Sequence, residues 1–95
     1  MLKMSDKQLR KLILVNRTPL EEIVLNVILS LRELKEDEIL VLKGRGDYIP
    51  KAIDVYNEVK KRLGNALILE NVSIGSEKAG RRILSYIEIS LRFVT

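Results

Sequence analysis

The chain has 95 residues, of which 46% are hydrophobic and 32% are charged, and it carries a formal net charge of +4. This composition is typical of one folded globular domain, and the excess of cations favours polyanionic partners where the cations cluster. The sequence contains no cysteine and no histidine, which excludes disulfides, thiol catalysis and the commonest ligands for transition metals.

The beginning of the chain, MLKMSDKQ over residues 1–8, is polar and predicts a flexible tail ahead of a single domain over residues 9–95. LRKLILV, residues 9–15, is a short run that favours β structure and predicts the first strand. No stretch is both long and apolar enough to cross a bilayer, so we expect a cytoplasmic protein that makes no membrane contact.

The next segment, NRTPLEE, has the signals of a helix start. Thr18 is a favoured N-cap, Pro19 suits the first helical position, and Glu21 would complete a Thr-x-x-Glu capping box. Apolar residues then recur at spacings of three and four, which predicts one buried face. That face comprises Leu20, Ile23, Val24, Val27, Ile28, Leu31 and Leu34. Leu25 and Leu29 lie on another side of this helix, either as ordinary surface or as a subunit contact.

A central strand is predicted over residues 38–43, EILVLK, because most of this run is apolar. A second helix follows and ends near Leu63, where Gly64 provides a stop signal. Asp47 is placed to cap its start, and Pro50 is tolerated because it falls in the first turn. The predicted buried face of this helix comprises Ile49, Ala52, Ile53, Tyr56, Val59 and Leu63.

The last third of the chain is predicted to form two strands. ALILENVSI, residues 66–74, forms the third, and a change in apolar alternation between Leu69 and Val72 predicts a β-bulge. The fourth strand alternates, and its apolar side comprises Ile83, Ile87, Ile89, Leu91 and Phe93. The segment between them, GSEKAGRR over residues 75–82, is polar and predicts a hairpin loop.

The predicted order of elements is therefore βαβαββ. Strand-helix-strand units produce parallel strand pairs, whereas the final hairpin is antiparallel. We expect a single-domain α+β fold in which a four-stranded mixed sheet carries both helices on one face.

Catalytic signals are weak in this sequence. The acidic runs Glu21–Glu22 and Glu36–Glu38 fall at a helix start and in a loop, where acids are common for structural reasons. No nucleophile stands with a base in a triad-like pattern, and the glycines near Lys43 spell neither a P-loop nor a dinucleotide fingerprint. We therefore expect no enzymatic activity, no cofactor, no metal and no small-molecule substrate.

The stretch KGRGDYIPK gathers Lys43, Arg45 and Lys51 where the second strand ends and the second helix starts. Backbone N–H groups and the helix dipole at this start would add to the positive field. Gly44 and Gly46 would let the backbone approach a phosphate closely. The stretch is consistent either with a phosphate site or with a plain tight turn.

Two further basic segments accompany this stretch. Arg17 follows the first strand, and the corresponding ends of parallel strands lie at the same edge of a sheet. Lys78, Arg81 and Arg82 lie on the hairpin between the last two strands. Each cation alone is compatible with an ordinary solvated charge, whereas the segments together predict one phosphate-binding surface.

Three longer motifs occur in order over roughly residues 10–93: NRTPLEEIV, KGRGDYIPKAID and NVSIGSE…GRR…SYIEISLR. The middle motif is the most specific, and it is carried by Lys43, Arg45, Gly46, Ile49, Lys51, Ala52, Ile53 and Asp54. Together the motifs resemble those of the Alba family of archaeal chromatin and RNA-binding proteins.

The resemblance implies a fold like that of the C-terminal domain of translation initiation factor 3. It also implies a homodimer, or a heterodimer with a paralogue, that binds double-stranded DNA and RNA with little sequence preference. Such a protein condenses DNA and is associated with the chromosome. By the same resemblance, the residues of the body that contact phosphate would be Arg17, Lys43, Arg45 and Lys51. Residues 75–82 would form an arm that reaches along the minor groove.

Two alternative functions stay open at this point. The same basic surface suits an RNA-binding protein or a subunit of an RNA-processing complex, because structured RNA is recognised by shape and backbone. The chain is also consistent with a module whose only task is to pair with a paralogue.

The chain departs from the family pattern at three places. Arg17 and Thr18 replace a Lys-Lys pair whose first lysine is an acetylation switch in the family, so we expect that control to be lost here. Asp47 stands where some members carry a second arginine, which should lower affinity for phosphate unless Asp47 caps the second helix. Leu63 replaces an aromatic residue linked to contacts between dimers. These departures indicate a divergent paralogue.

Overall fold

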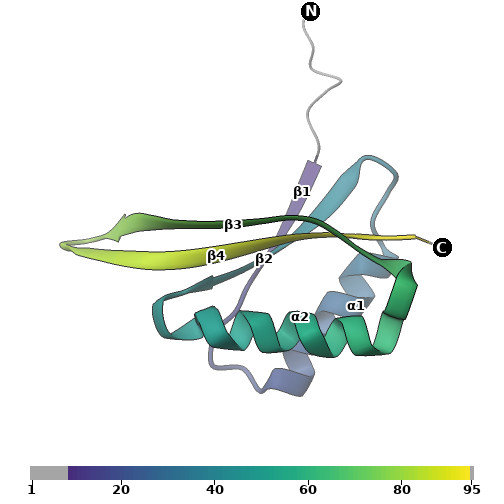
Figure 1. Ribbon diagram of the computed structural model, residues 1–95, viewed down its shortest axis with the longest axis horizontal. Coiled ribbons are helices and arrows are strands. Elements are labelled where there is room, and N and C mark those ends of the chain that lie inside the picture. Colours follow the sequence, from purple (N-terminus) through teal and green to yellow (C-terminus); the bar gives the residue numbers. More distant parts are fainter. Residues whose placement is uncertain (1–8, 95) are drawn as a thin grey trace, which may run out of the picture.

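The computed structural model describes residues 9–94, so the tail predicted over residues 1–8 lies outside the described residues. The elements β1, α1, β2, α2, β3 and β4 span Leu9–Leu14, Leu20–Arg32, Glu38–Arg45, Ile49–Leu63, Leu67–Ala79 and Arg82–Phe93. The strand order in the sheet is β1-β2-β4-β3, with β1 parallel to β2 and β4 antiparallel to both of its neighbours. Both helices cover one face of the sheet (Figure 1), which confirms the predicted four-stranded α+β fold.

The core lies between the two helices and the sheet. Its fully buried side chains are Val24, Val27, Leu31, Leu40, Leu42, Ala52, Val55, Val59 and Leu91. In α2, Val55 is buried, whereas Ile53, which was predicted to be buried, is 41% exposed. Two overlapping stripes with helical spacing run along α2, and packing against the sheet selects the one that contains Val55. The predicted face of α2 was therefore wrong at Ile53, and the predicted face of α1 was wrong at Leu20, which is 38% exposed at the first position of the helix.

The start of α1 differs from the predicted capping box. The helix begins at Leu20 after Pro19, and no side chain caps it. The backbone N–H of Thr18 instead donates to Oδ1 of Asn16 at 2.9 Å. Thr18 is therefore held within the preceding loop, and the capping box predicted for Thr18 and Glu21 does not form.

β2 and β3 extend further than predicted, whereas β1 ends at Leu14, one residue earlier than predicted. β2 continues through Arg45, and β3 continues through Ala79, so most of the predicted loop over residues 75–82 lies in a ladder with β4. The register shift between Leu69 and Asn71 confirms the predicted bulge. Gly80, with φ of +66°, allows the tight turn that joins the two strands. The resulting hairpin extends past the helices at one end of the molecule (Figure 1).

Candidate nucleic-acid interface

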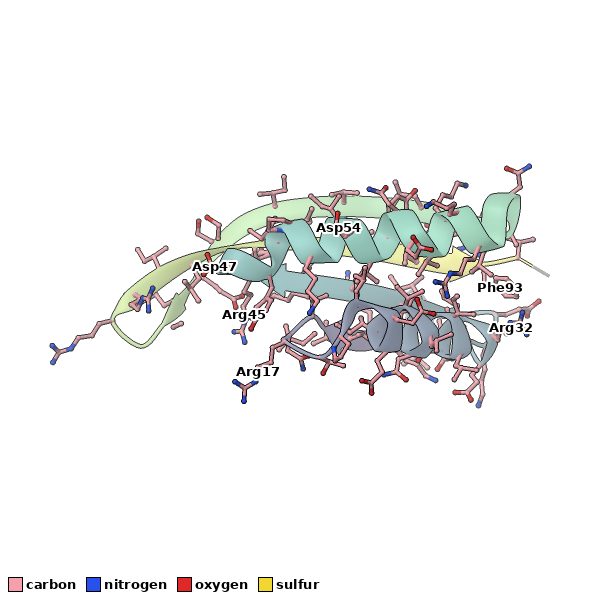
Figure 2. All side chains as sticks on the ribbon, turned by 90° about the horizontal axis from the view of Figure 1, so that it is seen from below. Arg17, Arg32, Arg45, Asp47, Asp54 and Phe93 are labelled. Atoms are coloured by element: carbon pink, nitrogen blue, oxygen red, sulfur yellow. The ribbon has the colours of Figure 1, made fainter. Side chains whose placement is uncertain are left out.

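Two of the three predicted basic segments meet at one end of the body. Leu14 of β1 pairs with Lys43 of β2 in parallel register, so the loop that holds Arg17 follows β1 at the edge where β2 reaches Arg45. Arg17 and Arg45 project from this end, and Arg32 and Phe93 lie at the opposite end (Figure 2). The β3–β4 hairpin extends from the same end as Arg17 and Arg45, which brings the third basic segment to that side.

The hairpin cations are freely exposed. Lys78 precedes the turn, Arg81 lies in it and Arg82 begins β4. The ion pairs found among residues 9–94 involve none of these three side chains, nor Arg17. Their charges are therefore available to a polyanion without first breaking an ion pair within the described part of the chain.

Lys43 and Arg45 are already partnered, contrary to the expectation of open phosphate contacts. Nζ of Lys43 lies 2.9 Å from Oε1 of Glu77 and 3.4 Å from Oε2 of Glu88. Nη1 of Arg45 donates to Oε2 of Glu77 at 3.0 Å. The Lys43 side chain is 16% exposed, whereas that of Arg45 is 40% exposed. Of the two cations, Arg45 is the one that an incoming phosphate can reach.

The charges of this cluster reinforce one another. The hydrogen bond from Lys43 lowers the pKa of Glu77, and the hydrogen bond from Arg45 lowers it further, against a smaller effect of burial. In turn, the hydrogen bond to Glu77 raises the pKa of Lys43. Lys43 and Glu77 therefore both stay charged near neutral pH.

The glycines of the predicted site have different roles. Gly44 is buried in β2, where an added Cβ would lie 2.5 Å from the carbonyl oxygen of Tyr48 and 2.9 Å from Cβ of Ala52. Its missing side chain lets β2 pack against the start of α2, so its backbone is not open to a phosphate. Gly46, with φ of +55°, permits the turn that leaves β2.

Lys51 binds the protein itself. Its Nζ donates to the carbonyl oxygens of Asn16 at 2.8 Å and of Thr18 at 2.6 Å. These bonds tie the loop that carries Arg17 to the first turn of α2. Lys51 thus positions Arg17 instead of presenting an open charge.

Asp47 does not cap α2. The Gly46–Tyr48 turn precedes the helix without a side-chain cap, and the N–H of Ile49 donates to the carbonyl of Gly46. Asp47 stays exposed, two residues after Arg45. The predicted cap was wrong because a tight 3₁₀ turn of the backbone begins this helix.

Sequence reasoning missed the residues that organise the cluster, which are Glu77, Tyr86 and Gly75. The ring of Tyr86 crosses Gly75 so closely that an added Cβ would lie 2.7 Å from the tyrosine oxygen. Nζ of Lys43 lies 4.6 Å from the centroid of the same ring. Only the pairing of Gly75 with Tyr86 across the hairpin reveals this arrangement, and no local pattern in the sequence signals it.

Comparison with known protein families matches residues 11–76 to Alba. The chain belongs to the Alba family. Two relatives, each called DNA/RNA-binding protein Alba 2, come from Saccharolobus solfataricus and Saccharolobus shibatae. Each is 42% identical over 91 residues, which cover 96% of this chain and 99% of the relative.

Solved Alba structures share the fold. Alba from Thermoplasma volcanium superposes with a TM-score of 0.75 at 27% identity, over 86% of this chain and 99% of that one. ALBA1 from Trypanosoma brucei also gives a TM-score of 0.75, at 16% identity, over 93% of this chain and 73% of that one. The resemblance identified from the three motifs is thereby confirmed.

The relatives of this Alba-family chain are named as DNA/RNA-binding proteins and not as enzymes, in agreement with the expectation that the chain has no catalytic function. Residues 9–94 contain no group of three or more acidic side chains that could hold a metal ion. In the same range, no helix has both the length and the apolar character needed to span a membrane.

Leu63, which the resemblance implied would depart from the family pattern, is partly buried against the core of this Alba domain. It lies at the end of α2, just before Gly64. Its side chain is therefore partly committed to the fold of its own chain.

Proposed function

We propose that this Alba-family chain binds double-stranded DNA, largely without sequence preference, as an architectural protein of the chromosome. The observation that carries the proposal is the gathering of Arg17, Arg45 and the basic hairpin at one end of the molecule. The names of its two Alba 2 relatives support a nucleic-acid partner.

Binding is electrostatic in this proposal. Arg17 and Arg45 contact phosphates from the body, and Lys78, Arg81 and Arg82 do so from the arm. Neutralised phosphates release condensed counterions, which supplies affinity that does not depend on base sequence. Tyr86, the aromatic residue nearest these cations in the hairpin ladder, is covered on one face by Lys43 and faces Gly75. It therefore offers no platform on which a base could stack.

The proposed form is a dimer. Ile53 on α2 and four residues of the hairpin, Leu69, Val72, Ile74 and Ile83, are exposed apolar side chains. Val72 and Ile74 pair with the buried Ile89 and Ile87 of β4, so their side chains lie on the face of the sheet that carries the helices. The helices do not extend far enough to cover them. Ile74 is 76% exposed, and such a group of apolar side chains favours burial by a second copy or a paralogue.

The dimer is tested by light scattering on the purified chain. The expected mass is that of two chains, and Ile74→Lys should shift it towards one. Leu12→Lys on β1 is the matched control, because it also adds a charge at an exposed apolar position, at the sheet edge opposite β3, and should leave the mass unchanged. A wild-type mass of one chain at micromolar concentration, both alone and mixed with a paralogue, would remove the dimer from the proposal.

The binding proposal is tested by a salt series with mixed-sequence DNA duplexes. The logarithm of the association constant should fall by about 0.9 per phosphate contact for each tenfold rise in salt. With about 6–10 contacts, the affinity should drop by about three to five decades between 50 and 200 mM salt. Salt-independent binding, or a strong preference for one sequence, would contradict the mechanism.

RNA is the second candidate ligand, favoured by the words DNA/RNA-binding in the names of both relatives. The same cations can follow the backbone of a folded RNA, because that recognition depends on shape and phosphates. Competition between a duplex DNA and a folded RNA of equal length at one salt concentration separates the two. Preferential retention of the RNA would assign the chain to RNA and not to the chromosome.

A further inference from the structure

One carboxylate lies inside the proposed interface. Glu77 belongs to the arm, on β3, yet its two oxygens bind cations of the body on β2. Because β4 lies between these strands in the sheet, the side chains of Glu77 and of the two cations together reach across a whole strand. Each oxygen holds a different cation, Lys43 through Oε1 and Arg45 through Oε2.

The hairpin is built so that this reach is possible. Arg45 and Gly75 are both paired with Tyr86 on β4, from opposite sides. Because Gly75 has no side chain, the ring of Tyr86 can lie directly across its backbone. Glu77 is two residues further along β3, on the same side of the strand as Gly75. Its carboxylate thus meets both cations, of which Lys43 lies over the Tyr86 ring.

Chemically, this carboxylate resembles the ligand that the interface is proposed to take. Carboxylates and phosphates are both anions that bind a guanidinium through charge-assisted hydrogen bonds. A carboxylate held within the same chain competes at a high effective concentration. The pair is nevertheless displaceable, because ion pairs with partly exposed members contribute little stability. Arg45, at 40% exposure, is the member that can exchange partners.

We propose that Glu77 is an internal competitor for phosphate, which holds Arg45 in the free protein and lowers the affinity of the arm and body for nucleic acid. This inference rests on the proposed function. A bound phosphate takes the place of the Glu77 carboxylate on Arg45, while Lys43 keeps Glu88 as a partner. Glu77 thereby limits the tightness of binding and sets part of its salt dependence.

The test measures the affinity of Glu77→Gln for a mixed-sequence duplex by fluorescence anisotropy at about 100 mM salt. Loss of the competing charge should tighten binding by about threefold to tenfold, on the scale of one or two partly exposed ion pairs. Glu70→Gln is the matched control, since Glu70 is also on β3 and pairs with Arg92, away from Arg45. It removes the same net charge and should change affinity by less than about twofold.

A second comparison locates the effect. In an Arg45→Ala background, the gain from Glu77→Gln should disappear, because the side chain for which Glu77 competes is gone. Circular dichroism checks that each variant keeps its fold. Glu77→Asp is a second, more conservative variant that tests the same contact if Glu77→Gln does not fold. Its shorter side chain retains the charge but cannot reach both cations, so its affinity should lie between those of wild type and Glu77→Gln.

The outcomes separate this inference from the function on which it rests. If binding by the wild type depends steeply on salt but Glu77→Gln binds no tighter than Glu70→Gln, the inference about Glu77 is wrong and the proposed function stands. Weaker binding by Glu77→Gln also overturns this inference and identifies Glu77 as an organiser of the arm. Absence of binding by wild type and all variants overturns both proposals.

Discussion

Gly44→Ala should destabilise the fold strongly, because the space above Gly44 is filled by backbone. An added Cβ would lie 2.5 Å from the carbonyl oxygen of Tyr48 and 2.9 Å from Cβ of Ala52. The first contact is with the turn that starts α2, so relief requires the helix start to move away from β2. Overpacking of this kind costs typically 1–3 kcal/mol, and the backbone contact places this case at about 3 kcal/mol.

The corresponding fall in melting temperature is about 12–24 °C, since 1 kcal/mol shifts a domain of this size by about 4–8 °C. Thermal unfolding followed by circular dichroism measures it. Gly75→Ala is the control, because its Cβ would meet the end of the Tyr86 side chain, which can rotate away. That variant should lose no more than about 1 kcal/mol. A melting temperature of Gly44→Ala within about 3 °C of wild type would refute the packing argument.

Three further predictions follow from the interface. Arg45→Ala should weaken binding to duplexes of different sequence by similar factors in parallel titrations; a loss confined to one sequence would indicate base readout. Lys51→Met should weaken duplex binding about threefold, because the loop of Arg17 loses both hydrogen bonds from the Lys51 side chain. Lys60→Met removes a lysine-to-carbonyl hydrogen bond at the other end of α2 and should have a smaller effect. The pKa of Glu77 is lowered from 4.5. The ion pairs of its carboxylate therefore stabilise the fold above pH 4.5, and this contribution is lost as pH falls through the lowered pKa. Wild type should therefore lose more melting temperature than Glu77→Gln between about pH 6 and about pH 3; equal losses would contradict the ion pairs.

The order of elements and their approximate limits were predictable from the sequence. Apolar spacing of three and four in residues 23–31 and alternation in residues 87–91 are local signals of which faces are buried. The break in alternation after Leu69 likewise predicted the bulge. These signals succeed because a few neighbouring residues determine them.

Details that depend on competition between local options were not predictable. Thr18 had the chemistry of a helix cap, yet its N–H bonds to Asn16 and its carbonyl accepts from Lys51. Ile53 and Val55 both fitted a helical stripe, and only the position of the sheet beneath α2 decided which was buried. In each case the sequence permits two arrangements, and packing between distant segments selects one.

The sequence by itself determined that three basic segments exist and that parallel strands bring two of them to one edge. The tertiary structure alone decided which of those cations are open. Lys43, Arg45 and Lys51 find partners 32 to 45 residues away in the chain, whereas the hairpin cations have none among residues 9–94. The physical reason is the short range of ion pairs and hydrogen bonds: composition and spacing count charges, but only the folded backbone brings an opposite charge to within about 3 Å.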